Sequence, residues 1–306
     1  MCPGQGAQKV GMGRDLAERF PAARDTFAAI DDALDVPLSR IMWEGPQDEL
    51  TLTHNAQPAI VAHSAAVLSV LGDRLTDTRA ATGHSLGEYS AHIAAGSLAA
   101  TDAARLVRRR GELMLEAGRA RPGAMAAVVG LDPDAVAAAC REASGDGSVA
   151  VPANLNGPEQ TVISGDPAAV AQAGENCRAR GAKRVIPLKV SGAFHSPLMG
   201  PAASGLAEAL AGVHFGTPRF PVVANATAAP VRGADEAVRL LVEQLTAPVR
   251  WTECMRTAAA LAPGAVFLEV GPGNVLAGLL KRIVPGGRAV TLGTAGEIEA
   301  FLQAAE

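Results

Sequence analysis

The chain has 306 residues, of which 48% are hydrophobic and 19% are charged, and its formal net charge is -4. A chain of this size and apolar content can bury a large core, which excludes disorder and allows one large domain or two modest ones. The weak net charge and the 3% aromatic content argue against a nucleic-acid partner, so a polyanionic ligand would need a local basic patch.

Targeting and metal signals are lacking in the sequence. It opens on MCPGQGAQ and contains no run of 18 or more apolar residues, so we expect a cytoplasmic protein with no membrane partner. The cysteines lack C-x-x-C spacing, and the histidines form no H-E-x-x-H motif, which argues against a disulfide scaffold and a metal site. We interpret the cysteines as small apolar residues in a reducing compartment: Cys2, Cys140, Cys177 and Cys254.

Short apolar runs alternate with longer segments of helical period, a pattern typical of an α/β fold with mostly parallel strands. Apolar spacing predicts a helix over 12–34 that is interrupted near Pro21, and a second helix to Gly72 that Asn55 would cap. A short apolar strand over 80–82 then runs into Gly-His-Ser-Leu-Gly, and a helix over 88–95 follows.

The pattern of predicted strands and helices changes at Gly123. Strands and helices alternate as β-α-β-β-α-β, which is the ferredoxin-like pattern. The expected ranges are 124–129 (strand), 133–143 (helix), 149–153 and 161–164 (strands), 167–180 (helix) and 185–190 (strand). We therefore predict a ferredoxin-like small domain over 123–190, inserted into a larger α/β-hydrolase-like domain made of 1–122 and 191–306.

The larger domain is expected to resume with a helix from Ser191 to about Ala211. Further elements follow in the order strand, helix, helix, strand and helix, and the last helix follows a Gly-Pro-Gly-Asn turn. Their expected ranges are 222–224, 235–245, 252–260 and 266–270, with the final helix after 274.

The segment Gly83-x-Ser85-x-Gly87 lies between the predicted strand and helix and matches the nucleophile-elbow pattern. In such a turn the hydroxyl is lifted above the sheet, and side chains at the two glycine positions would crowd the backbone. Free N–H groups of the following helix point at the charge that develops during attack. The same spacing also arises by chance in a chain with 33 glycines, so the strand-turn-helix context is what makes Ser85 the candidate nucleophile.

A serine hydroxyl needs a base, usually histidine, within hydrogen-bond reach. His195 is the best of six candidates because its Ser-Gly-Ala-Phe-His-Ser-Pro segment lies between a predicted strand and a helix, where functional side chains are often displayed. His84 and His92 flank the elbow, but in a tight turn His84 points away from its neighbour and His92 lies within the helix. The other histidines are interpreted as surface or helix-packing residues: His54, His63 and His214.

Six motifs in one order give the sequence a specific resemblance. They are PGQGAQ at the start, GHSLGEYSA at 83–91, LVRRRGELM at 106–114, SGAFHSPLM at 191–199, EQLTAPVRW at 243–251 and EVGPGNVL at 269–276. Together they resemble the malonyl-CoA:acyl carrier protein transacylase family over essentially the whole chain, including the inserted ferredoxin-like segment. This family carries an apolar strand before PGQG, whereas only Met1 and Cys2 precede Pro3 here, so we expect a truncated start or a short sheet edge.

The resemblance implies a role for each matching residue. It makes Ser85 the nucleophile and His195 its partner, with the main-chain carbonyl of Gln244 orienting the histidine. The backbone N–H groups of Gln5 and Leu86 would form the oxyanion hole. The implied reaction passes malonyl from malonyl-CoA to the thiol of acyl carrier protein by a ping-pong route in fatty-acid or polyketide synthesis, without a metal or redox cofactor, and we expect the enzyme to be a monomer.

The resemblance assigns Arg110 to the free carboxylate of the substrate. Arg110 belongs to a run of three arginines on a predicted helix, and residues 100° apart cannot all face the same way, so one can face inward while the others stay hydrated. A buried guanidinium suits a carboxylate because it makes two parallel charge-assisted bonds. In related polyketide-type acyltransferases, phenylalanine in an xAFH pattern accompanies malonyl selection, which makes Phe194 a candidate for restricting space at the α-carbon of the substrate.

Three alternatives stay open at this point. An α/β-hydrolase, either an esterase or a thioesterase, would share the elbow, although no HGGG-type loop is present. A noncatalytic subunit that docks carrier proteins would share the fold. A freestanding acyltransferase that loads polyketide carriers would share the whole mechanism.

Overall fold

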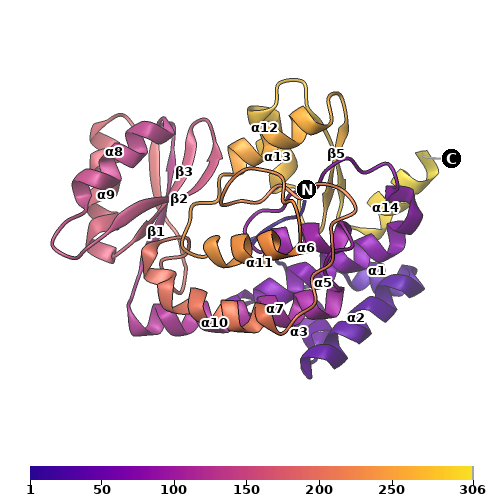
Figure 1. Cartoon of the computed structure of the whole chain (residues 1–306). Coiled ribbons are helices and arrows are strands. Elements are labelled where there is room, and N and C mark those ends of the chain that lie inside the picture. The colour runs from indigo at the N-terminus through magenta and orange to yellow at the C-terminus, as the bar shows by residue number, and fades with distance from the viewer. Residues whose placement is uncertain (305–306) are drawn as a thin grey trace.

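A parallel sheet and a separate antiparallel sheet form the framework of the protein, and helices pack around both (Figure 1). The structure is a computed structural model and describes residues 1–304. The unit with the antiparallel sheet lies at one end, and the long helices of the first third of the chain lie at the other. This mixed α/β architecture agrees with the predicted fold class.

The parallel sheet is centred on β5 (Val266–Val270) and β6 (Arg288–Leu292), which pair in parallel register. Single parallel bridges and backbone hydrogen bonds continue the sheet across residues 1–2, 81–83 and 222–223. The strands expected over 80–82 and 222–224 are therefore short segments of this sheet. The elbow at Ser85 follows directly from one of them.

Helices pack around the parallel sheet. In the first part of the chain they are α1 (Arg14–Arg19), α2 (Pro21–Leu34), α3 (Leu38–Glu44), α4 (Gln47–Thr51), α5 (Thr53–Leu71), the short η1 (Gly72–Leu75), α6 (Gly87–Ala94) and α7 (Ala100–Ala120). In the last part they are the short η2 (Pro197–Met199), α10 (Gly200–Ala211), α11 (Ala234–Glu243), α12 (Trp251–Leu261), α13 (Val275–Ile283) and α14 (Ala295–Ala304). Most of the predicted helices are present, and the interruption near Pro21 falls between α1 and α2.

Two local predictions were wrong. Asn55 does not cap α5, because the helix begins at Thr53; the Asn55 side chain lies inside it and donates to the main-chain oxygen of Glu49 at 2.9 Å. The helix expected from Ser191 begins only at η2, and residues 191–196 form an irregular segment. That irregular backbone positions His195.

The antiparallel sheet contains β1 (Ala124–Val129), β2 (Ala150–Gly157), β3 (Gln160–Gly165) and β4 (Arg184–Pro187), in the spatial order β2-β3-β1-β4. Helices α8 (Pro133–Ala143) and α9 (Pro167–Ala179) connect the strands in the predicted order. One apolar cluster of this unit consists only of residues between 124 and 185.

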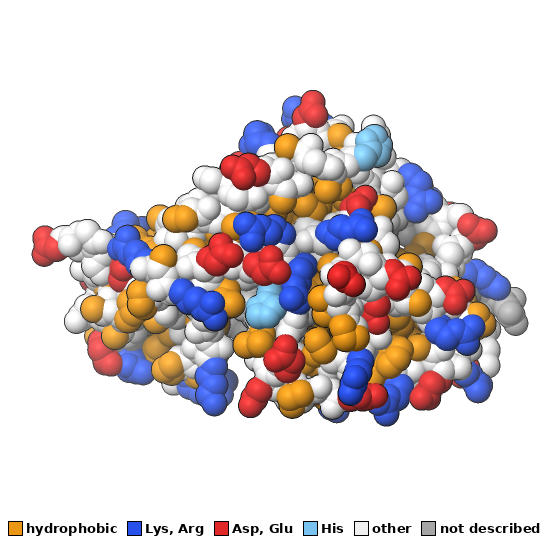
Figure 2. All heavy atoms as spheres, turned by 90° about the horizontal axis from the view of Figure 1, so that it is seen from below, with side chains coloured by type: hydrophobic (Ala, Val, Ile, Leu, Met, Phe, Trp, Pro, Cys, Tyr) orange, Lys and Arg blue, Asp and Glu red, His pale blue; other side chains and the backbone are white. Residues whose placement is uncertain are grey.

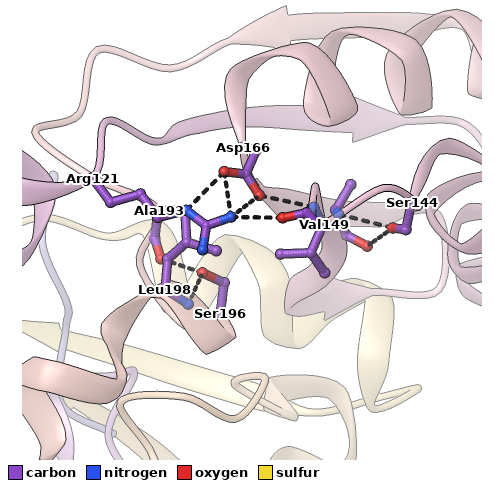
Figure 3. Close-up of polar contacts among 9 residues, drawn as sticks. Arg121, Ser144, Val149, Asp166, Ala193, Ser196 and Leu198 are labelled. Carbon is purple, nitrogen blue, oxygen red and sulfur yellow. Dashed lines mark hydrogen bonds and ion pairs between the residues drawn. The ribbon is translucent and has the colours of Figure 1, made fainter.

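The two chain junctions of this unit run against each other (Figure 3). A Cβ on Gly123 would lie 2.5 Å from the backbone nitrogen of Ala193, so only glycine allows this approach. Arg121, just after α7, forms three charge-assisted bonds to Asp166 at 2.8, 2.9 and 3.0 Å, and Ser196 donates to Ala193 O at 2.7 Å. The segment that carries His195 is therefore held at the base of the small unit.

The surface carries charges of both signs, and the thiols are buried. Lys, Arg, Asp and Glu side chains are intermixed over the face shown in Figure 2. All four cysteines are unpaired and buried, as predicted, and burial raises the pKa of each thiol, to about 12 for Cys140 and Cys254. Within residues 1–304, no helix combines the length and apolar character needed to cross a membrane.

Candidate active site

Ser85 lies in a strained turn between residues 81–83 of the parallel sheet and α6. Its φ angle is +52°, a left-handed conformation that side chains rarely adopt. A Cβ on Gly83 would come within 1.9 Å of Gly87 O, and a Cβ on Gly87 would come within 2.3 Å of Cys2 O. Both glycines are therefore required sterically, and the turn presents Ser85 at the start of the helix.

His195 faces the serine hydroxyl. Its Nε2 lies 2.7 Å from Ser85 Oγ, although 110 positions separate the two residues. Its Nδ1 lies 2.8 Å from the main-chain oxygen of Gln244, which can only accept, so Nδ1 carries the proton and Nε2 is free to accept one from Ser85. His195 also has a positive φ of +56°, so both members of the pair have strained backbones.

Arg110 is the third member of the cluster. Its side chain comes from α7, is 1% exposed, and donates through Nη2 to Ser85 Oγ at 3.1 Å. The neighbouring Arg108 and Arg109 form ion pairs with Glu112 nearer the surface, an arrangement that helical spacing allows. The other partners of Arg110 are neutral: Gln57 Oε1 at 2.7 Å from Nη1 and Gln244 Oε1 at 3.1 Å from Nη2. A buried cation with neutral partners leaves this site electropositive.

Electrostatics keep His195 neutral. Burial, which is the largest effect, and the positive charge of Arg110 together lower the pKa of His195 to about 3. Burial also lowers the pKa of Arg110, while Tyr89 and Glu88 raise it. A neutral imidazole is the form that can accept a proton from Ser85.

Gln5 and Leu86 are the two residues whose backbone N–H groups are predicted to act as donors to an oxyanion. Leu86 immediately precedes the first residue of α6, and Gln5 lies in the PGQGAQ loop. Within residues 1–304, no protein acceptor is bound to the amide N–H of either residue. Two free N–H groups of this kind can receive an oxyanion.

A cavity of about 310 Å³ lies next to Ser85. Its lining includes Gln5, Ser85, Arg110, Phe194 and His195, so it brings five of the predicted residues to one space. Phe194 is 6% exposed and contributes its ring to this wall and to the apolar core. The volume is at the lower end of the range for small-molecule sites.

Sequence reasoning missed three polar residues of this cluster. Gln57 holds Arg110, Asn225 accepts the Ser85 N–H through Oδ1 at 2.7 Å, and Glu88 accepts the Asn225 N–H at 2.9 Å. Only Glu88 lies in a motif that sequence analysis singled out, where it had no assigned role. Within the described residues, no group of three or more His, Cys, Asp or Glu side chains is arranged to hold a metal ion.

Known proteins resemble this chain over most of its length. Residues 1–294 match the acyl transferase domain family. The malonyl CoA-acyl carrier protein transacylases of Bacillus subtilis and Escherichia coli are 44% and 45% identical to the chain; each alignment covers 92% of this chain, and 88% and 91% of the relative.

The chain belongs to the malonyl-CoA:acyl carrier protein transacylase family. Solved structures from this family have the same fold. An acyl carrier protein S-malonyltransferase from Vibrio cholerae superposes with a TM-score of 0.93 at 41% identity, covering 98% of this chain and 97% of that one. A malonyl-transacylase solved in complex with a type II PKS acyl carrier protein superposes with a TM-score of 0.92 at 42% identity, covering 99% and 97%.

Proposed function

We propose that the protein transfers a malonyl group from malonyl-CoA to the phosphopantetheine thiol of an acyl carrier protein, through an ester on Ser85. The observation that carries this proposal is the position of Arg110. Its guanidinium is buried, has no carboxylate partner within 4 Å among the described residues, and lies 3.1 Å from the nucleophile. A fixed cation next to an acyl-transfer site suits an acyl group with a free carboxylate at its far end.

In the first half of the proposed cycle, His195 Nε2 takes the proton of Ser85 as Oγ attacks the thioester carbonyl. The amides of Gln5 and Leu86 stabilise the oxyanion, each contributing roughly 3 kcal/mol as in comparable acyl-transfer sites. The tetrahedral intermediate then collapses. The carbon–sulfur bond breaks, and the sulfur of coenzyme A leaves with the proton from His195.

In the second half, the thiol of the carrier protein gives its proton to His195 and attacks the ester. The bond to Ser85 Oγ breaks, and the serine regains its proton from the imidazolium. The carbonyl of Gln244 stabilises that imidazolium through Nδ1, in place of the carboxylate of a Ser-His-Asp triad. No metal or redox cofactor enters the cycle.

Malonyl selectivity is proposed to arise from desolvation. An acetyl group would leave Arg110 without an anion in a buried site, whereas malonyl supplies a bidentate partner. Pairing with the malonyl carboxylate would also neutralise the charge that lowers the pKa of His195, and so make the base stronger when the correct substrate is bound. Phe194 is proposed to limit space beside the α-carbon.

The proposed partners follow from the same chemistry and from the relatives. Both curated relatives are named for malonyl-CoA and acyl carrier protein, and one similar structure holds a polyketide carrier, so carriers of fatty-acid and of polyketide synthesis are both candidates. A monomer in the cytoplasm, without nucleic-acid or membrane partners, stays a prediction from the sequence.

We also propose the domain description. The parallel sheet with its elbow supports an α/β-hydrolase-like large domain made of 1–122 and 191–306. The order β2-β3-β1-β4, with two connecting helices and an apolar cluster of its own, supports a ferredoxin-like small domain over 123–190.

The direct test is mass spectrometry of the protein after brief exposure to malonyl-CoA. We expect one malonyl group on Ser85, transfer of that group to an added carrier protein, and no adduct on Ser85→Ala. An absence of adduct on the natural sequence would exclude the proposal and favour a noncatalytic docking subunit. Rapid release of free malonate without any carrier thiol would favour a thioesterase.

A further inference from the structure

Glu88 is linked to the reactive residues by the side-chain amide of Gln244. This amide accepts from Arg110 Nη2 through Oε1 at 3.1 Å, and donates through Nε2 to Glu88 Oε2 at 2.7 Å and to Ser85 O at 3.0 Å. The main-chain oxygen of Gln244 accepts from His195 at the same time. Gln244 therefore contacts Ser85, His195 and Arg110, and Glu88 accepts a hydrogen bond from its side-chain NH₂ group.

The orientation of this amide has only one good solution. Arg110 offers donors only, while Glu88 Oε2 and Ser85 O act as acceptors. A reversed amide would set its oxygen against two acceptors and its NH₂ group against the guanidinium. Each unmatched buried group costs about 1–3 kcal/mol, so the pairing with Glu88 determines which end of the amide faces Arg110.

Glu88 also reaches the nucleophile by a second route. Its Oε2 accepts the backbone N–H of Asn225 at 2.9 Å. The Asn225 side chain accepts the Ser85 N–H at 2.7 Å and donates to Gly83 O at 2.8 Å, on both sides of the strained turn. A single carboxylate thus binds the side-chain amide of Gln244 and the backbone N–H of Asn225, the residue whose own side chain brackets the elbow.

Glu88 itself does not touch the substrate cavity. It is fully buried, and the residues that line the cavity do not include it. Burial raises the pKa of Glu88 to about 7, although the bonds from Asn225 and Gln244 and the charge of Arg110 lower it. A buried acid that costs this much to ionise, yet lies at the centre of the network, calls for a functional explanation.

We propose that Glu88 is a positioning residue of the acyl-transfer reaction, which holds Arg110 toward the acyl carboxylate through Gln244 and holds the Ser85 turn through Asn225. The inference rests on the proposed malonyl transfer and deepens it. The competing explanation is a purely structural acid in the first turn of α6, where negative charge stabilises a helix. The two explanations differ in acyl selectivity, because only the first connects Glu88 to Arg110.

The experiment compares single-turnover acylation of the full chain by malonyl-CoA and by acetyl-CoA, followed by mass spectrometry, in three variants. Glu88→Ala removes the acceptor, and Glu88→Gln keeps an oxygen that can accept from both partners. Glu269→Ala is the matched control, since Glu269 is equally buried. Its carboxylate also accepts hydrogen bonds from two backbone N–H groups, those of Leu276 and Ala277, at 3.0 and 2.7 Å. Final labelling and the melting temperature report folding separately from rate.

For Glu88→Ala we expect complete final labelling, a malonylation rate that is lower by roughly 10- to 100-fold, and a malonyl-to-acetyl ratio lower by at least about fivefold. Glu88→Gln should restore both quantities to within about threefold of the natural sequence. Glu269→Ala should lower the melting temperature but keep the ratio.

The inference is overturned if Glu88→Ala has the same malonyl-to-acetyl ratio as the natural sequence. It is also overturned if the ratio falls equally in Glu269→Ala, or if Glu88→Gln does not restore it. If Glu88→Ala is insoluble, Glu88→Asp decides, because it keeps the acid in α6 but withdraws it from Gln244; its ratio must fall. Failure of the natural sequence to become malonylated at all would instead contradict the proposed function.

Discussion

Arg110 donates to Ser85 Oγ over 3.1 Å, so a hydrogen bond joins the cation directly to the nucleophile. The remaining contacts of the guanidinium are with the amide oxygens of Gln57 and Gln244. A buried guanidinium is usually compensated by a carboxylate. In the proposed cycle the substrate supplies that carboxylate, which makes charge compensation part of substrate selection.

Replacing Arg110 by Ala should therefore reduce kcat/KM for malonyl-CoA by about 100-fold or more while affecting acetyl-CoA much less, because only malonyl loses an ion pair. Steady-state rates with both thioesters measure this effect. Arg109→Ala is the matched control on the same helix, because Arg109 is exposed and pairs with Glu112 and Glu116. A preserved malonyl preference in Arg110→Ala would place the carboxylate site elsewhere.

The fall in rate at acid pH should also depend on Arg110. The charge of Arg110 lowers the pKa of His195, so Arg110→Gln should raise that pKa and move the half-maximal rate on the acid side to higher pH. The profile of kcat/KM for acetyl-CoA is the appropriate measurement, since this substrate makes no pair with Arg110. An unchanged or lower midpoint would show that the two groups are not coupled.

The Phe194→Ala variant tests whether the ring of Phe194 limits the space at the α-carbon of the substrate. Phe194→Ala should raise the ratio of methylmalonyl to malonyl transfer, measured by competition between the two thioesters, because the ring lines the cavity beside Ser85. It should also lower stability by about 3–5 kcal/mol, as for other buried phenylalanines. Phe215→Ala removes a ring that is similarly buried but does not line this cavity, and it should lower stability without changing the ratio.

Acid should destabilise the fold through buried neutral histidines. Burial lowers the pKa of His63 and of His92 to about 4, below the ordinary value of 6.5. Between these values the unfolded chain binds more protons, so the stability present above pH 6.5 is lost as the pH falls toward 4, on the order of 3 kcal/mol for each imidazole. Urea unfolding at pH 7.5 and 5.5 measures the first part of this loss, on the order of 1 kcal/mol for each imidazole.

His92→Asn should reduce that pH dependence, because it removes one of the buried imidazoles whose pKa is lowered. His214→Asn is the control, since His214 is exposed. Equal pH dependence in the His92 variant and the natural sequence would contradict the assignment.

The sequence predicted the elements whose signal is local. Proline at the first helical position and regular apolar spacing located α8 and α9, and the two glycines around Ser85 indicated the elbow. Helical geometry indicated that one of the three arginines can face inward, and the family resemblance identified it as Arg110. The predicted cap at Asn55 was wrong because a capping residue type also occurs inside helices, where its side chain can bond to a neighbouring element, here Glu49 of α4.

The polar side chains that position Ser85 and Arg110 could not be predicted in this way. Gln57, Asn225 and Gln244 come from distant parts of the chain, and neutral amides have neither periodicity nor charge to distinguish them from surface residues. For Gln244, the family resemblance implied a role for the main-chain carbonyl alone. The contacts of its side chain with Arg110 and Glu88 depend on where α11 ends relative to α6 and α7, which only the assembled fold determines.

The burial of all four thiols has a practical consequence. Because each cysteine is enclosed and its pKa is raised, the protein carries little thiolate at neutral pH. A cysteine introduced on the rim of the cavity, for example at the exposed Lys189, would be the fastest to react with a maleimide dye. Fluorescent reporters of carrier docking could thus be attached at one chosen point without first removing the native sulfurs.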